Sequence, residues 1–206
     1  MSRRPGAAGS LCLVLLLAAA VGPRPAGAEI VDRVLAVVDG AIITQSDVAG
    51  VSRLGLEPAA ARTLAAVRDA LIERRLILAE VDRYAPADPP EADVDRALEA
   101  LRARVGAAAA ATILTETGGS IEQLRRYLRD SLRIEFYMQQ RFGTIQPTEF
   151  DIAEYYRAHA ADVGSRSLAD SREAIVAALA SERRAVLVKD WVAGLRRRAN
   201  INVLPE

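Results

Sequence analysis

The chain has 206 residues, with 27 basic and 27 acidic side chains, one histidine and one cysteine. It therefore lacks the basic excess typical of nucleic-acid binding, and no nucleic-acid partner is expected. About half of the residues are hydrophobic, and many of these are alanines, which favour helices over a large core.

The first 28 residues have the pattern of a secretory signal peptide. Two arginines precede an apolar block from Leu11 to Val21, and three small residues end at Ala28. The block is too short to cross a bilayer, so cleavage between Ala28 and Glu29 is expected and stable membrane insertion is not. The only cysteine, Cys12, leaves with this segment, as do three arginines, so 24 basic residues face 27 acidic ones, a mature net charge of −3.

A β-hairpin is predicted at the start of the mature chain. Within the stretch from Ile30 to Thr44, an apolar run from Val34 to Val38 meets Asp39-Gly40 and resumes with Ala41. Asp-Gly between two such runs favours a type I′ turn. Because a lone hairpin is marginally stable, we predict that Ile201 to Leu204 forms a third strand beside it. The alternative is a frayed tail after the last helix.

Helices are predicted for nearly all of the intervening chain. Capping residues, prolines and glycines place them at about 45–53, 58–84, 90–105, 107–117, 121–142, 149–159 and 168–199. The small and polar residues 161–167 are predicted to be a linker between a segment of 29–160 and a closing segment of 168–206. The fold is thus predicted to be mostly α with one small β element.

The apolar stripes of these helices identify the candidate core. Leu64 is assigned to the stripe of the second helix, Leu132 and Phe136 to that of the fifth, and Val186 and Leu187 to that of the last. The arginines alternate with Glu and Asp, which is typical of a solvent-exposed face held by ion pairs.

Reactive groups for catalysis are sparse. His159 is the only histidine, and no cluster of histidines or cysteines suggests a metal site, so no catalytic residue, metal or other cofactor is predicted. The Gly118-Gly119 pair is interpreted as a helix break, because neither a lysine nor a suitable strand accompanies it as in a phosphate-binding loop.

Aromatic residues are concentrated in one stretch. Seven of the nine lie between Tyr127 and Tyr156. Phe136 continues the apolar stripe and is predicted to be buried, whereas Tyr137 falls away from it and is predicted to be exposed. An exposed aromatic surface can hold unfolded polypeptide. The candidate peptide-binding residues are Tyr137, Phe142, Tyr155 and Tyr156. The alternative is that the rings pack the helices against one another.

The sequence resembles the SurA-type periplasmic chaperones over nearly the whole mature chain. The most specific match is the opening, Val31 to Gly40 followed by Ile42-Ile43 and Ser46-Asp47-Val48. Further matches lie at Leu71 to Leu78, Leu124 to Ile134, Ile145 to Glu149, and in the final helix with Trp191.

This resemblance implies a helical chaperone core that the C-terminal helix and strand complete. In that family one or two parvulin-type prolyl isomerase domains are inserted between the two pieces, here at residues 161–167. A domain needs on the order of 100 residues, so no isomerase domain fits.

The function implied is an ATP-independent periplasmic holdase for unfolded polypeptides, chiefly outer-membrane proteins, without enzyme activity. The sequence leaves two alternatives open. One is an isomerase-related protein with degenerate or absent catalysis, and the other is a periplasmic helical scaffold that binds one folded partner. The oligomeric state is not predicted.

Overall fold

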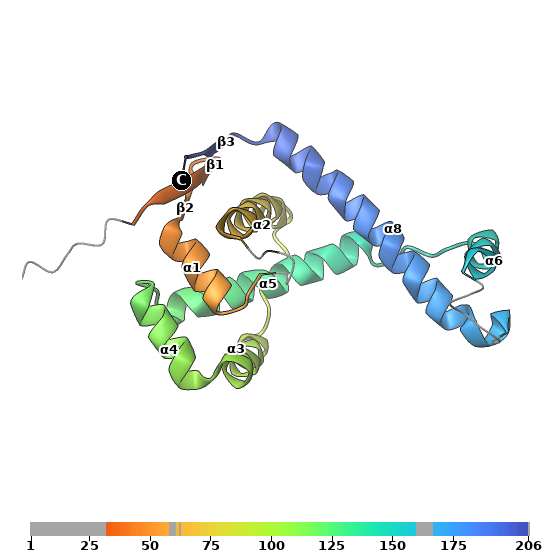
Figure 1. Cartoon of the computed structure of the whole chain (residues 1–206), viewed down its shortest axis with the longest axis horizontal. Helices are drawn as coiled ribbons and strands as arrows, with labels where there is room; N and C mark the ends of the chain where they lie inside the picture. The colour runs from red at the N-terminus through yellow and green to blue at the C-terminus, as the bar shows by residue number, and fades with distance from the viewer. Residues whose placement is uncertain (1–31, 58–60, 62, 160–166, 206) are drawn as a thin grey trace, which may run out of the picture. The chain divides into compact units, whose positions relative to one another are not determined.

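The computed structural model describes residues 32–57, 61, 63–159 and 167–205. The predicted signal peptide with its cleavage site at Ala28 and Glu29, the start of the hairpin at Ile30, and linker residues 161–166 lie outside this range. In the described residues the chain forms helices and one small sheet (Figure 1). The elements are β1 (Val34–Val38), β2 (Ala41–Thr44), α1 (Gln45–Arg53), α2 (Leu64–Tyr84), α3 (Glu91–Val105), α4 (Ala107–Glu116), α5 (Ile121–Phe142), α6 (Glu149–Ala158), α8 (Leu168–Arg198) and β3 (Ile201–Val203).

The sheet joins the two ends of the described chain. Its strand order is β2-β1-β3, with both pairs antiparallel, and Val38 lies opposite Ala41 on one side and Ile201 on the other. Asp39 and Gly40 have φ angles of 47° and 87°, as a type I′ turn requires. The predicted hairpin and its third strand are confirmed.

The hairpin turn is bonded directly to the chain between α8 and β3. The Asp39 amide donates to the carbonyl oxygen of Asn200 at 2.9 Å, and the Asn200 amide donates to Oδ1 of Asp39 at 2.8 Å. Further along, the Leu204 amide donates to the Leu35 carbonyl at 3.0 Å. The alternative of a frayed tail is therefore wrong.

Two hydrophobic clusters hold the elements together. The first packs the inner face of the sheet, including Ala36 and Ile43, against α1, α2 and Leu195 of α8. The second joins α3, α4 and the first half of α5, with Val94 and Leu98 at its centre. Both clusters use residues that the helical periodicity of the sequence predicts to be buried.

Side-chain caps fix three helix starts where the sequence predicts them. Thr44 with Asp47, Ser120 with Gln123, and Thr148 with Asp151 each exchange hydrogen bonds between side chain and backbone as a capping box.

The start of α2 differs from the prediction. The helix begins at Leu64, where the Thr63 hydroxyl accepts a hydrogen bond from the Ala66 amide at 3.1 Å, and not at residue 58. Leu64 is 56% exposed, so its assignment to the core is also wrong. The Thr63 side chain satisfies a backbone amide of the first turn, which favours a helix start at Leu64.

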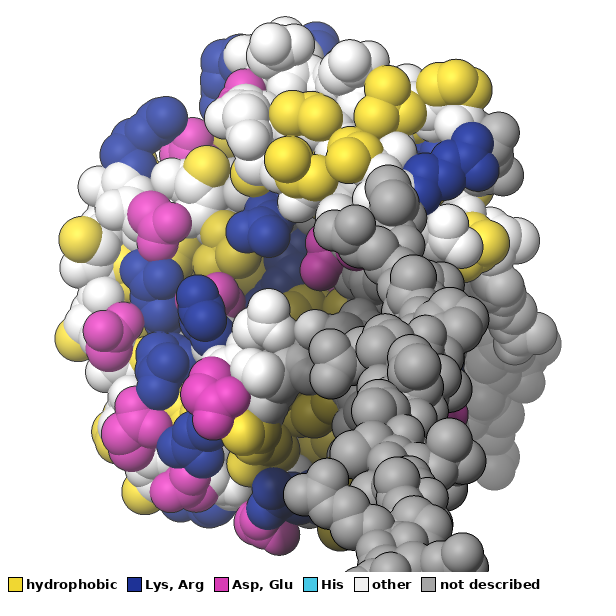
Figure 2. All heavy atoms as spheres, turned by 90° about the vertical axis from the view of Figure 1, so that its left-hand side faces the viewer, with side chains coloured by type: hydrophobic (Ala, Val, Ile, Leu, Met, Phe, Trp, Pro, Cys, Tyr) yellow, Lys and Arg dark blue, Asp and Glu magenta, His cyan; other side chains and the backbone are white. Residues whose placement is uncertain are grey.

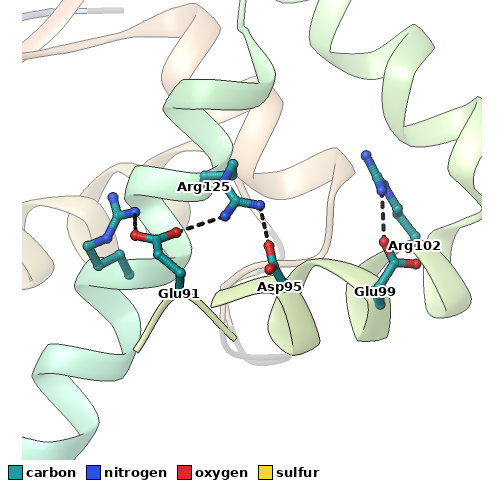
Figure 3. A network of polar contacts seen from close by, with 6 residues as sticks. Glu91, Asp95, Glu99, Arg102 and Arg125 are labelled. Carbon is teal, nitrogen blue, oxygen red and sulfur yellow. Dashed lines mark hydrogen bonds and ion pairs between the residues drawn. The ribbon is translucent and has the colours of Figure 1, made fainter. Parts of the chain in front are cut away.

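Ion pairs cover the contact between α3 and α5. Arg125 of α5 reaches Glu91 at 2.8 Å and Asp95 at 2.6 Å, both on α3 (Figure 3), and Arg129 also pairs with Glu91. Figure 2 shows acidic and basic side chains interspersed over one face, with apolar side chains gathered at the level of the sheet. The predicted ion-paired surface is confirmed at the contact of α3 with α5.

No helix in the described ranges is both long and apolar enough to span a bilayer.

Candidate functional site

Tyr137 and Phe142 lie in an aromatic cluster and not on an open surface. Their exposed fractions are 6% and 9%, and their ring centroids lie 5.9 and 5.6 Å from that of Trp191 on α8. Tyr84 covers Tyr137 from the end of α2, at 5.5 Å. The predicted exposure of Tyr137 is wrong, because α8 packs on this side of α5. These two rings bind the helices together, as the alternative interpretation expected.

Arg141 closes the edge of this cluster. Its guanidinium carbon lies 5.2 Å from the Trp191 ring centroid, and its Nη1 donates to the Tyr137 hydroxyl at 3.2 Å. A cation over an indole face stabilises the contact, so this arginine is bound to the aromatic cluster and is not free for a ligand.

Tyr155 and Tyr156 are half-buried on α6. The Tyr155 ring stacks on His159 with centroids 3.9 Å apart, and the His159 ring nitrogen Nδ1 lies 2.9 Å from the Tyr155 carbonyl oxygen. The single histidine is thus part of the end of α6. Neither of the two clefts described next is lined by any of the four predicted peptide-binding residues.

The first cleft lies beside the C-terminal half of α5. It has a volume of about 580 Å³. Leu132 and Phe136 supply apolar wall from α5, and Pro89 and Pro90 supply it from the segment before α3. Phe136 is 51% exposed, so its predicted burial is wrong. A half-exposed aromatic side chain in a cleft is available to a ligand.

Charged side chains surround this apolar wall. Arg184 of α8 reaches across to Gln139 of α5, with Nη1 3.2 Å from Oε1. Arg133 is mostly buried and pairs with Asp82 at 2.8 Å and with Asp88 at 3.4 Å. Burial acts to lower the pKa of Arg133, but these carboxylates outweigh it and the pKa is raised. Arg133 is therefore a fixed positive charge at the cleft.

The second cleft lies along the middle of α8. It has a volume of about 460 Å³ and is lined by Leu179, Val186 and Leu187, with Ile145 from the segment before α6. Val186 and Leu187 are 54% and 47% exposed, so their assignment to the core is wrong. Among the described residues, no other element covers this side of α8, so both side chains are exposed.

The two clefts adjoin the same stretch of α8. Arg183 lines the second cleft and its chain neighbour Arg184 lines the first. Arg183 also pairs with Asp151 of α6 at 2.5 Å, which fixes its direction. Each cleft thus combines an apolar wall with charged side chains at its border.

The sequence-based prediction did not identify Phe136, Val186 and Leu187 as cleft residues, although the sequence carries one signal for the last two. Residues 185–188 are four consecutive apolar residues on a helix, and these occupy more than one full turn. A helix that packs by one stripe cannot bury all four. Phe136 gave no such signal, because it continues the stripe of Leu128 and Leu132.

Both clefts combine apolar walls with arginine and carboxylate side chains. Neither cleft is lined by a histidine, cysteine or serine. In the part of the chain that the structure describes, no group of three or more His, Cys, Asp or Glu side chains is placed to hold a metal ion.

No protein-family model matches the sequence, and no curated protein matches it significantly.

Proposed function

We propose that this protein is an ATP-independent holdase that binds unfolded polypeptide segments in the two clefts beside α8. The observation that carries the proposal is the exposure of Phe136 in one cleft and of Val186 and Leu187 in the other. These side chains expose apolar surface of the kind that folded proteins usually cover with a ligand or a partner.

The shape and chemistry of the clefts favour an extended client. Unfolded strands of outer-membrane barrels present apolar side chains on alternate positions, and burying these side chains prevents the strands from pairing with one another. The clefts provide apolar walls for such side chains and charged groups for the backbone and polar positions. Affinity is expected to be modest, because ordering a flexible client costs conformational entropy.

The resemblance to the SurA-type chaperones supports the same proposal. The pairing of β1 with β3 is the arrangement that the resemblance implies for the chaperone core. The position of an inserted isomerase domain corresponds to seven residues, 161–167, far fewer than a domain needs. We therefore propose a periplasmic chaperone without isomerase activity, whose clients include outer-membrane proteins.

The proposal is tested by light scattering of an unfolded outer-membrane protein diluted from urea. The mature protein at stoichiometric ratio should suppress aggregation. Phe136→Gln should weaken client binding roughly fivefold, since half-burying such a side chain contributes about 1 kcal/mol. The double variant Val186→Gln/Leu187→Gln removes two such side chains and should weaken binding roughly thirtyfold.

Phe150→Gln is the matched control, because Phe150 is 68% exposed and lines neither cleft. No suppression by the unmodified protein would exclude a holdase. Equal effects of the Phe136 and Phe150 substitutions would exclude the first cleft as the binding site. Capture of one folded partner, with no preference for unfolded chains, would favour the scaffold alternative.

A further inference from the structure

A third, smaller cavity lies between α2 and α5 and shares no lining residue with the two clefts. It has a volume of about 280 Å³. Its apolar lining comes from Val51, Leu71 and Leu78, and its guanidinium groups come from Arg74, Arg75 and Arg126. Three cations thus lie beside an apolar wall, and Asp130 is the carboxylate in the same lining.

Arg74 is fixed at this cavity by its neighbours. Its Nη2 donates to the Tyr127 carbonyl oxygen at 2.7 Å, and its guanidinium carbon lies 3.7 Å from the Tyr127 ring centroid. The Tyr127 hydroxyl in turn donates to Oε1 of Glu57 at 2.8 Å. Burial lowers the pKa of Arg74 and raises that of Glu57. Arg74 is a structural cation with little freedom to move.

Arg75 and Arg126 are different, because both are exposed and neither has a hydrogen bond or ion pair among the described residues. The carboxylate that lines the cavity, Asp130, already lies 3.6 Å from Nη1 of Arg133. The side chains that line the cavity, three arginines and one carboxylate, thus carry an excess of positive charge.

The geometry points to a binding site for a carboxylate on an apolar stem, namely the C-terminal end of a client polypeptide with an apolar last residue. Arg75 and Arg126 would bind the terminal carboxylate, and the wall of Val51, Leu71 and Leu78 would contact the last side chain. This inference rests on the proposed function and extends it to the end of the client chain.

Two physical arguments favour a chain end. A planar guanidinium matches a carboxylate with two parallel hydrogen bonds, and such charge-assisted bonds are stronger than neutral ones. The cavity volume also lies just below the ~300–1,000 Å³ typical of small-ligand sites, so it suits one terminal residue better than a continuous segment.

The position of the cavity on α5 is compatible with a client that also occupies the first cleft. Arg126 lines the cavity and Phe136 lines the cleft, ten residues further along the same helix. That separation is about 15 Å along the helix axis, which an extended chain covers with about five residues.

The test uses an N-acetylated decapeptide with apolar residues and a C-terminal leucine, made as the free acid and as the amide. Fluorescence anisotropy of a labelled peptide gives the Kd of each form for the mature protein. The acid should bind roughly tenfold tighter than the amide. Arg75→Gln/Arg126→Gln should remove this difference and leave the amide affinity unchanged.

Arg197→Gln/Arg198→Gln is the matched control, since it removes two exposed charges that do not line the cavity. It should keep the preference for the acid. Equal binding of acid and amide to the unmodified protein, or a preserved preference in Arg75→Gln/Arg126→Gln, would overturn the inference. Inorganic phosphate that displaces the acid at the Kd of the peptide would overturn the assignment to a chain end.

Failure of this inference is distinct from failure of the proposed function. If the holdase proposal is wrong, neither peptide form binds and aggregation is not suppressed. If only the chain-end site is wrong, both peptide forms bind with the same Kd and aggregation is still suppressed.

Discussion

Asp39 combines a left-handed backbone conformation with two hydrogen bonds to the backbone of Asn200. Its backbone amide is the donor in one and its carboxylate is the acceptor in the other. An aspartate suits this position because short polar side chains tolerate a positive φ angle better than other residues with a β-carbon. One side chain therefore stabilises both the hairpin turn and its attachment to the closing segment.

Substitution of this residue separates these contributions. Asp39→Ala should lower the free energy of unfolding by about 2 kcal/mol, since it loses a hydrogen bond and places a β-carbon at positive φ without compensation. Asp39→Asn keeps an acceptor oxygen and the same backbone tolerance, so its loss should be small. Urea denaturation followed by circular dichroism measures both. Equal losses in the two variants would contradict this assignment.

At the scale of single elements, α5 changes its packing partners along its length. Its first half packs on α3 and α4 through Leu124 and Leu128, and its second half contacts α8 through Tyr137 and Phe142. Tyr137 follows Leu128 by nine residues, which turns the side chain about 180° around the helix axis. The buried face therefore switches sides, and this leaves Phe136 in the cleft.

Two ion pairs lie at the contact of α6 with α8, Arg172 with Glu149 and Arg183 with Asp151, and they should be sensitive to acid. Hydrogen bonds from Arg183 and Thr148 hold the pKa of Asp151 at about 2, below its ordinary value of 3.8. Arg172 likewise lowers the pKa of Glu149. A carboxyl whose pKa is lowered by folding contributes fully above about pH 4, and the contribution is lost as the pH falls toward 2.

Backbone amide chemical shifts of α6 should therefore change between pH 4 and pH 2 as these ion pairs are lost. Asp151→Asn should make this transition smaller and leave only the part due to Glu149. Glu154→Gln is the control, because Glu154 is an exposed carboxyl of the same helix without an ion pair among the described residues. An unchanged transition in Asp151→Asn would exclude this ion pair as its origin.

At the scale of the whole described chain, Trp191 connects segments that are far apart in sequence. Its ring lies against Tyr137 and Phe142 of α5, and it packs on the cluster formed by the sheet, α1 and α2. The same helix forms one border of both clefts. The position of Trp191 thus sets how α8 borders the two clefts.

Trp191→Ala should lower the free energy of unfolding by about 3 kcal/mol, near the low end for aromatic truncation, because the ring is only half-buried. Trp191→Phe should retain most of the packing and lose less than half as much. Thermal and urea denaturation provide the comparison. A loss below 1 kcal/mol in Trp191→Ala would show that the aromatic cluster does not hold α8 in place.

Local interactions are the part of this structure that the sequence alone determined. Asp39-Gly40 predicts the hairpin because few residue pairs adopt two positive φ angles. The capping pairs at Thr44, Ser120 and Thr148 predict helix starts because each satisfies its own backbone amides within three residues. Helical periodicity likewise predicts Val94, Leu98 and Leu124 as core, since the apolar stripes of α3, α4 and the first half of α5 meet in one cluster.

Only the tertiary structure decided which side chains remain open to a ligand. Tyr137 and Phe136 are neighbours with similar apolar area, and the one that α8 covers is buried while the other lines a cleft. Whether Arg75 and Arg126 form ion pairs likewise depends on where the fold places carboxylates that are distant in sequence. Helical periodicity predicts which face of a helix is apolar, but whether a side chain on that face is exposed depends on which other helix packs against it.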